Sequence, residues 1–377
     1  MTHTYKKSMM EVEMLQKNHT LDTRIVRYKR LVTLNEIRKE IPKSKFAGQT
    51  VYNARRGIEA ILDGDSEKKV IVVGPCSVHE SESAFEYAAR LNELSGKVSD
   101  IFLLVMRTYF EKPRTGLGWP GLINDPDING KEDLNKGYRL ARTILSKIND
   151  MGVPCATEYV DTDTPQLIGE FISWAAIGAR TSYSQDHRRM ASGLSSPVGF
   201  KNDTSGDVSV AINGILVAKE KGHKFPGIDP SGFAAEVETE GNPECHIVLR
   251  GGSSGPNYDV KYVQEAQAAL KAKGLPPVVM VDCSHDNCGK DYRKQPEVFT
   301  KAIKQIRDDG NSGIIGIMVE SHLFEGKKDI PTNLKGFDRS TLPYGISITD
   351  GCVSWDTTER LIMGAFKSLS RSTVYFT

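Results

Sequence analysis

The sequence predicts an α/β protein of the (β/α)8 class, a TIM barrel with an N-terminal extension and long loops after its strands. Three observations support this fold. The 377-residue chain contains eight short apolar runs, helix-length segments separate most of them, and each run ends in a charged or metal-liganding residue. Apolar runs that alternate with helices in this way are typical of a buried parallel sheet.

The eight runs are the expected strands. In chain order they are KVIVVGPC to Cys76, IFLLVMR to Arg107, VPCATE to Glu158, WAAIGAR to Arg180, PVGFK to Lys201, HIVLR to Arg250, PPVVMVDCSH to His285 and GIIGIMVE to Glu320. The helices are expected at 81–95, 134–149, 164–172, 185–194, 207–221, 258–273, 295–308 and 356–371. Because active sites of such barrels lie at the carboxyl ends of the strands, the end residues are expected to share one site.

The chain divides into an N-terminal arm and helical extension, residues 1–66, and a catalytic barrel, residues 67–377. Residues 1–20 are polar and are expected to form an arm. Apolar residues recur at helical spacing between 21 and 66. The stretches 107–133, 222–244 and 321–355 are expected to be long and irregular, and loops of this kind often carry substrate contacts.

Composition narrows the class of function. The chain has 49 basic and 48 acidic residues, a balance that argues against nucleic acid or an anionic membrane as the main partner. No apolar run approaches the roughly 20 residues that span a bilayer. The first residues lack the apolar stretch of a signal peptide. Six cysteines are scattered, three of them in or beside expected core strands, which favours a reducing cytoplasm over a disulfide framework.

Four residues at or just beyond strand ends are candidate metal ligands: Cys76, His285, Glu320 and Asp350. A thiolate, an imidazole and two carboxylates suit a divalent transition metal such as Mn, Fe, Co or Zn. Taken singly, each has a plainer interpretation, such as a small core cysteine or a loop histidine. A competing possibility is a local zinc site in DCSHDNC, formed by Cys283, His285 and Cys288, although a fourth nearby ligand is lacking.

Six basic residues at strand ends or in the loop at 107–133 form a candidate anion site: Arg107, Lys112, Arg114, Arg180, Lys201 and Arg250. Arginine grips phosphate and carboxylate groups in a bidentate manner, and lysine adds a point charge and a transferable proton. Six charges exceed the need of one monophosphate, so two phosphorylated substrates are expected. The alternative is solvated surface charge, which explains poorly why several of these residues directly follow apolar runs.

Two motif matches carry less weight. GLGWPG at 116–121 fits a dinucleotide-binding pattern, but no helix is expected to open there. GGSSG at 251–255 fits a nucleophile elbow around Ser253, yet a glycine-rich anion-binding loop after Arg250 explains the same letters.

Several motifs together resemble the class I 3-deoxy-D-arabino-heptulosonate 7-phosphate (DAHP) synthases of the feedback-regulated, enterobacterial and yeast-like subtype. The resemblance covers roughly residues 20–370 and is carried by GPCSVHE, MRTYFEKPRTGLGWPGLINDP, GARTSYSQDHRRMASGLSSPVGFKN, HIVLRGG, DCSHDN, GIMVESHL and SITDGCVSW. It implies a transferase that joins phosphoenolpyruvate to erythrose 4-phosphate in the first step of the shikimate pathway.

The resemblance assigns roles to matching positions. It implies that the metal ligands are Cys76, His285, Glu320 and Asp350, and that Lys112, Cys76 and His285 are the catalytic residues. The implied phosphoenolpyruvate contacts are Arg107, Lys112, Arg180, Lys201 and Arg250, with backbone from Gly178 and Ala179. The implied erythrose 4-phosphate contacts are Pro113, Arg114 and Thr115, and Asp350 is also implied as a substrate contact. Lys112 is expected to deliver a proton to the alkoxide that forms.

An aromatic amino-acid effector site is also implied, formed by Pro165, Gln166, Leu194, Ser195, Phe225 and Gly227. Gly227 matches the tyrosine-sensitive members. The sequence departs from the family at Tyr183, where an acidic residue is common, and at Pro230–Phe233, which replace a Lys-Trp-Gly-His-like run. The resemblance further implies a homodimer or homotetramer.

Two rival functions remain open at this point. One is a 3-deoxy-D-manno-octulosonate 8-phosphate synthase-like enzyme that takes another aldose phosphate, although KPRTGL stands where that family usually has KANRSS. The other is a non-catalytic, ligand-sensing barrel, against which the presence of Lys112 and all four candidate ligands counts.

Overall fold

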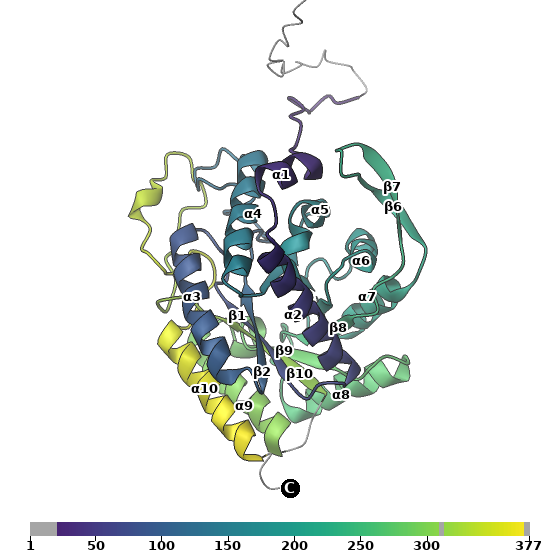
Figure 1. The fold of residues 1–377 in the computed structure, drawn as a ribbon, viewed down its shortest axis with the longest axis vertical. Coiled ribbons are helices and arrows are strands. Elements are labelled where there is room, and N and C mark those ends of the chain that lie inside the picture. The colour runs from purple at the N-terminus through teal and green to yellow at the C-terminus, as the bar shows by residue number, and fades with distance from the viewer. Residues whose placement is uncertain (1–20, 309–312, 373–377) are drawn as a thin grey trace, which may run out of the picture.

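The protein is a closed barrel of eight parallel strands surrounded by helices (Figure 1). The structure is a computed structural model, and it describes residues 21–308 and 313–372. Neighbouring strands follow the order β1-β10-β9-β8-β5-β4-β3-β2. The strands are β1 (Lys69–Gly74), β2 (Phe102–Arg107), β3 (Cys155–Tyr159), β4 (Ile172–Ile177), β5 (Val198–Lys201), β8 (Cys245–Leu249), β9 (Val279–Asp282) and β10 (Ile314–Glu320). Each predicted run overlaps one of them, although β3, β4 and β8 extend beyond their runs by one or two residues, so the predicted fold class is confirmed.

The helices that alternate with these strands also match the prediction closely. They are α3 (Ser81–Val98), α4 (Leu134–Asp150), α5 (Thr164–Ile168), α6 (Gln185–Ser192), α7 (Ser209–Lys219), α8 (Val260–Ala272), α9 (Gln295–Asp308) and α10 (Trp355–Ser372). The predicted helix at 164–172 is too long. It ends at Ile168, a 3-10 turn covers Gly169–Phe171, and β4 starts at Ile172.

Two arginine side chains bind backbone carbonyls at the point where that helix ends. Arg142 donates from Nη1 to the Leu167 carbonyl at 2.9 Å. Arg55 donates from Nη2 to the carbonyls of Gly169 and Ile172, both at 2.8 Å. The Leu167 carbonyl, which a longer helix would pair with the Phe171 amide, is thus bound by Arg142, and Arg55 binds carbonyls of the turn and of the first residue of β4.

Two further helices precede the barrel, α1 (Leu34–Glu40) and α2 (Lys45–Asp63). Thr33 and Glu36 form a capping box at the start of α1, and Gly64 ends α2 in the left-handed conformation with φ 81°. Ile58, Ile61 and Leu62 of α2 belong to the hydrophobic cluster of Val70, Val72, Val105, Trp174, Met280 and Met318 from the strands. The helical extension thus shares a hydrophobic cluster with the barrel strands. The predicted arm at 1–20 lies outside the described residues.

The stretch 222–244 contains regular structure, so the prediction that it is irregular was wrong. It forms an antiparallel hairpin of β6 (His223–Ile228) and β7 (Ala234–Thr239), which Figure 1 shows standing away from the barrel. The prolines obscured a period-two pattern in which Val237 and Thr239 turn inward and their neighbours face solvent. The hairpin turn contacts α1, since Asn35 N donates to the Pro230 carbonyl at 2.9 Å.

No helix within residues 21–308 and 313–372 is long and apolar enough to cross a membrane. All six cysteines are buried free thiols.

Candidate active site

A cavity of about 590 Å³ opens at the carboxyl ends of the strands, where the sequence placed the site. Its walls include eleven of the predicted residues: Arg107, Lys112, Pro113, Arg114, Thr115, Ala179, Arg180, Lys201, Arg250, His285 and Asp350. Cys76 and Glu320 are fully buried beside the Asp350 side of the cavity. We call this space the mouth cavity.

Three of the four predicted metal ligands converge at one edge of the mouth cavity. One ligand atom from each of Cys76, Glu320 and Asp350 lies within 4.8 Å of the other two. Cys76 follows β1, Glu320 ends β10, and these neighbouring strands pair with Gly74 opposite Glu320. Barrel closure therefore brings together residues that are more than two hundred positions apart. A thiol and two carboxylates at this spacing fit a divalent transition metal.

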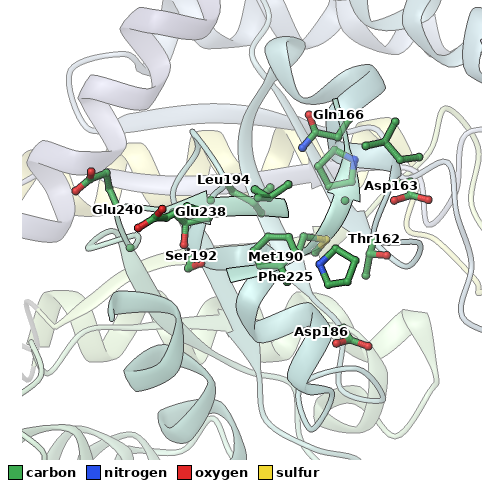
Figure 2. A pocket seen from close by; sticks show the side chains of 18 residues that line it. Thr162, Asp163, Gln166, Asp186, Met190, Ser192, Leu194, Phe225, Glu238 and Glu240 are labelled. Atoms are coloured by element: carbon green, nitrogen blue, oxygen red, sulfur yellow. Dashed lines mark hydrogen bonds between the residues drawn. The ribbon is translucent and has the colours of Figure 1, made fainter. Parts of the chain in front are cut away.

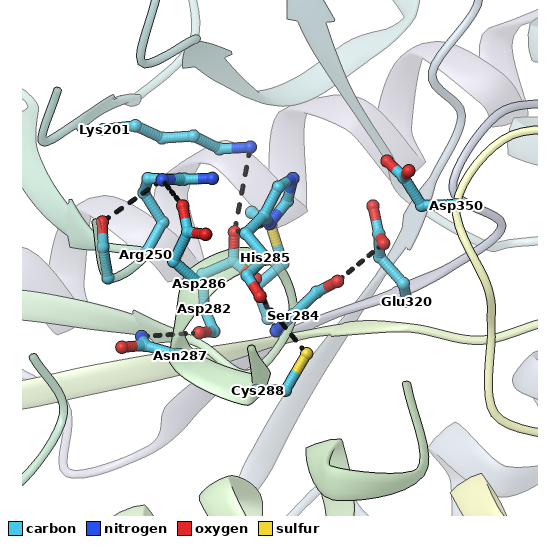
Figure 3. Close-up of polar contacts among 12 residues, drawn as sticks. Lys201, Arg250, Asp282, Ser284, His285, Asp286, Asn287, Cys288, Glu320 and Asp350 are labelled. Carbon is cyan, nitrogen blue, oxygen red and sulfur yellow. Dashed lines mark hydrogen bonds and ion pairs between the residues drawn. The ribbon is translucent and has the colours of Figure 1, made fainter. Parts of the chain in front are cut away.

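Buried polar groups fix the Glu320 carboxylate. The Ser284 hydroxyl donates to Oε2 at 2.7 Å, as Figure 3 shows. Arg107 Nη2 lies 3.0 Å from Oε1. The Arg107 guanidinium is itself held over the Tyr109 ring, 3.9 Å from its centroid. Since both oxygens are bound, Glu320 has a single orientation, which is what a metal ligand requires.

Lys112 lies against the candidate thiolate ligand. Its Nζ is 3.1 Å from Cys76 Sγ and 3.3 Å from the Cys76 carbonyl oxygen. Burial acts to lower the pKa of Lys112, but Cys76, Glu320 and Asp350 outweigh it and raise the pKa. Burial, together with Glu320, raises the pKa of the Cys76 thiol to about 12. A bound cation would favour the thiolate instead.

His285 does not join the compact group of three ligands. Its Nδ1 lies 2.8 Å from Asp282 Oδ2, an ion-pair distance without the alignment of a hydrogen bond. The residue has φ 58°, a left-handed conformation that is strained outside glycine and is common at functional sites. A histidine whose Nδ1 faces a carboxylate can present Nε2 to a metal. Its role as the fourth ligand stays a prediction.

The mouth cavity contains fewer unpaired positive charges than the six that the sequence predicted. Three of the six predicted cations already have carboxylate partners: Arg107 with Glu320, Lys201 with Glu158 and Arg250 with Asp286. Sequence reasoning assigned no role to Glu158 and Asp286, although Glu158 ended one of the eight apolar runs. The remaining cations are Lys112, Arg114 and Arg180, which still suit phosphorylated substrates.

Lys201 and Glu158 form a buried ion pair on the strand side of the mouth. Lys201 Nζ lies 2.7 Å from Glu158 Oε2 and 3.8 Å from Asp282 Oδ2. Burial alone would raise the pKa of Glu158, but Lys201 lowers it to about 2. Gly178 allows this arrangement, since an added Cβ there would come within 2.6 Å of Glu158 Oε1. The predicted glycine therefore makes room for the partner of Lys201.

The predicted aldehyde loop lies beside the predicted phosphoenolpyruvate residues. Arg180 donates from Nε to the Thr115 hydroxyl at 3.0 Å, which joins the two groups across the mouth. Ser253 also lines the cavity, but its hydroxyl makes no hydrogen bond within the described part of the chain. The nucleophile-elbow interpretation thus gains no support.

The rival zinc site is not supported either. The Cys288 thiol points its Sγ at the His285 carbonyl oxygen, at 3.4 Å. Among residues 21–308 and 313–372, the group of Cys76, Glu320 and Asp350 is the one that meets the spacing of a metal site.

A second cavity, of about 570 Å³, lies between α5, α6 and the hairpin (Figure 2). We call it the hairpin cavity. Five predicted effector residues line it: Pro165, Gln166, Leu194, Phe225 and Gly227. Ser195 lines a neighbouring cavity instead. The sequence missed Met190 and Val237, which add apolar surface, and the carboxylates of Asp163 and Asp186. Two more lining carboxylates, Glu238 and Glu240, come from the acidic stretch 222–244.

Comparison with known proteins gives one consistent result. Residues 37–363 match the model of the DAHP synthetase I family. The Tyr-sensitive phospho-2-dehydro-3-deoxyheptonate aldolase of Salmonella typhimurium is 44% identical over 356 residues, which are 94% of this chain and 98% of that one. The Phe-sensitive enzyme of Escherichia coli is 45% identical over 341 residues, 90% and 95% of the two chains.

Comparison with a solved structure leads to the same family. The phospho-2-dehydro-3-deoxyheptonate aldolase of Francisella tularensis superposes with a TM-score of 0.86 and is 42% identical, covering 91% of this chain and 98% of its own. With the family model spanning most of the barrel and relatives matched along almost their whole length, this chain belongs to the DAHP synthetase I family.

Proposed function

We propose that the mouth cavity is the active site of a DAHP synthase. The protein is a 3-deoxy-7-phosphoheptulonate synthase, which catalyses the first step of the shikimate pathway. Phosphoenolpyruvate, erythrose 4-phosphate and water give DAHP and phosphate. The observation that carries the residue assignment is the meeting of Cys76, Glu320 and Asp350 beside Lys112 at the barrel mouth.

The two substrates occupy adjoining parts of the mouth cavity. Phosphoenolpyruvate binds to Arg180, Lys201, Arg250 and Lys112, with Gly178 and Ala179 contributing backbone. Erythrose 4-phosphate binds to Pro113, Arg114 and Thr115. The contact between Arg180 and Thr115 supports this division, because it makes the two anion subsites neighbours. Holding both anions side by side supplies the proximity that a bimolecular step otherwise lacks.

The main role of Arg107 is to hold the Glu320 carboxylate in place. Its guanidinium is fully buried and already paired with that carboxylate. Its charge adds to the field at the phosphoenolpyruvate subsite and keeps Glu320 in one orientation.

A divalent metal ion, Mn, Fe, Co or Zn, is held by Cys76, Glu320 and Asp350, with His285 as the fourth ligand. The donor types and the spacing of the three grouped atoms fit such an ion. When bound, the ion supplies Lewis-acid polarisation of the aldehyde carbonyl.

Lys112 delivers the proton. The methylene carbon of phosphoenolpyruvate attacks the aldehyde carbon, and the carbonyl oxygen becomes an alkoxide that must be protonated. The Lys112 ammonium lies at the metal-ligand cluster and is kept charged by Cys76, Glu320 and Asp350. Water then adds to the cationic carbon of the former enol, and phosphate leaves by C–O cleavage.

The hairpin cavity binds an aromatic amino acid as an effector. Its apolar wall of Pro165, Met190, Leu194, Phe225 and Val237 suits an aromatic ring. Its four carboxylates oppose the effector's own carboxylate, which makes the inhibition weak.

Assembly into a homodimer or homotetramer, and a place in the cytoplasm, remain predictions.

A phosphate-release assay tests the function. Purified protein is given phosphoenolpyruvate with erythrose 4-phosphate or arabinose 5-phosphate, each with and without added Mn²⁺. We expect release with erythrose 4-phosphate and metal. Preference for the five-carbon aldose would favour the octulosonate-type enzyme, and no release under any condition would favour a sensing barrel.

A further inference from the structure

A third cavity, of about 460 Å³, lies outside the mouth, between the two N-terminal helices and the segment from α5 to α6. None of its lining residues lines the mouth cavity, and its residues Pro165, Gln166, Gly193 and Leu194 are shared with the hairpin cavity. In Figure 1 helices α1, α2 and α5 lie close together around this region. We call it the α1–α2 cavity. No role in the reaction accounts for it.

The walls of the α1–α2 cavity carry an excess of positive charge. Arg38, Lys43 and Arg55 line it, and Glu170 is the one carboxylate among its lining residues. Glu170 is already shared: Arg38 Nε lies at 3.3 Å, Lys43 Nζ at 3.7 Å, and Arg142 Nη2 also contacts it. One carboxylate cannot neutralise this cluster, so the cavity attracts anions.

Arg55 is fixed in place before any ligand arrives. Its Nε donates to the Ile172 carbonyl at 3.0 Å, and its Nη2 donates to the carbonyls of Gly169 and Ile172. Within the described residues its Nη1 takes no part in a hydrogen bond. A guanidinium held by its other nitrogens loses little side-chain freedom when it binds an anion.

The Tyr159 hydroxyl adds an independent sign of a ligand. Tyr159 lines the cavity and is 1% exposed, yet its hydroxyl has no hydrogen-bond partner in the part of the chain that the structure describes. It lies beside Arg55 and near Gly169, where an added Cβ would be 3.6 Å from the hydroxyl oxygen. Its oxygen is not among the fully buried atoms that lack a partner, so it is open to the cavity and can donate to a group bound there. A ligand oxygen in the cavity would supply that partner.

We propose that the α1–α2 cavity binds a small oxyanion, a phosphate or carboxylate group, outside the active site. Lys43, Arg38 and Arg55 provide the charge, and Tyr159 donates a hydrogen bond. The cavity has the size of a small-molecule site. Because it shares a wall with the hairpin cavity, an anion bound here also lies next to the proposed effector.

The test is calorimetric titration of the full chain with inorganic phosphate. Lys43→Gln removes a lining charge, and Tyr159→Phe removes only a hydroxyl. Lys45→Gln is the matched control, since Lys45 is exposed nearby and does not line the cavity. Arg114→Gln removes a positive charge from the mouth cavity, so it identifies any phosphate that binds there and not in the α1–α2 cavity.

We expect two classes of phosphate site. Lys43→Gln and Tyr159→Phe should weaken one class on the order of ten-fold, the loss that follows removal of one charge-assisted contact. Both variants should keep the wild-type KM for phosphoenolpyruvate. Lys45→Gln should change neither the affinity for phosphate nor the KM for phosphoenolpyruvate. Arg114→Gln should weaken only the other class.

The proposal fails if Lys43→Gln and Tyr159→Phe bind phosphate as wild type does, or if Arg114→Gln abolishes all binding. It also fails if Lys45→Gln has the same effect as Lys43→Gln, because that result indicates a diffuse surface charge. If Lys43→Gln does not fold, Tyr159→Phe decides the matter alone.

Discussion

Lys201 and Glu158 form a buried ion pair, 2.7 Å between Nζ and Oε2, at the ends of β5 and β3. Lys201 is a candidate phosphoenolpyruvate residue, and Glu158 determines where its ammonium lies. The pair also connects the site to stability, since each partner is too deeply buried to tolerate being left alone.

Replacing Glu158 with Gln should destabilise the protein by about 3 kcal/mol, because the buried Lys201 ammonium loses the nearer of its two carboxylate neighbours and keeps only Asp282, at 3.8 Å. It should also raise the KM for phosphoenolpyruvate more than it lowers kcat, since Lys201 loses its fixed position. Chemical denaturation and steady-state kinetics measure the two effects. An unfolding free energy equal to that of wild type would contradict the pairing.

The same pair predicts a pH dependence. The pKa of Glu158 is lowered from 4.5 to about 2 in the folded state, so the charged form is favoured by folding. The stabilisation is therefore complete above pH 4.5 and is lost as the pH falls toward 2. Unfolding free energies at several pH values in this window should fall more steeply for wild type than for Glu158→Gln. Parallel slopes would exclude Glu158 as a source of the acid sensitivity.

Chelation should abolish turnover, and Mn²⁺ or a similar divalent ion should restore it. The reason is the convergence of Cys76, Glu320 and Asp350 within 4.8 Å. Metal content and initial rate should be measured on the same preparation, with His285→Ala as a variant of weakened metal affinity. Full activity in a verified metal-free preparation would show that the cluster is not a catalytic metal site.

Lys112→Ala should remove activity far more completely than it weakens phosphoenolpyruvate binding. Several arginines share the anionic load, whereas one ammonium lies 3.1 Å from Cys76 Sγ. Loss of a general acid costs roughly 10²–10⁴-fold in rate. Calorimetry with phosphoenolpyruvate and the rate at saturating substrate should be compared. A variant that keeps a near wild-type rate would refute proton delivery by Lys112.

Phenylalanine, tyrosine and tryptophan should inhibit weakly, and any residual effect should favour tyrosine. The hairpin cavity is acidic, with Asp163, Asp186, Glu238 and Glu240 among its lining residues, and Pro226 stiffens its rim. Inhibition curves at millimolar amino acid test this, and Glu240→Gln should increase the sensitivity. Strong inhibition by micromolar phenylalanine or tyrosine would show that these carboxylates do not oppose the effector.

The sequence by itself determined the barrel, because strand and helix periods are local properties that alternate along this chain. It also located the mouth, since residues at carboxyl ends of parallel strands must meet at one face. That is why Cys76, Glu320 and Lys112, distant in sequence, could be assigned to one site. The hairpin at 223–239 escaped this reasoning, because Pro226 and Pro230 hid an alternation that only pairing with the partner strand confirms.

Only the tertiary structure decided which charges are free. Arg107, Lys201 and Arg250 looked alike in sequence, yet each has a carboxylate partner on another strand or loop. It also decided that His285 faces Asp282 and that Ser195 lies outside the hairpin cavity. These facts depend on distances between segments remote in the chain. Local periodicity contains no information about such distances, which arise when the barrel closes.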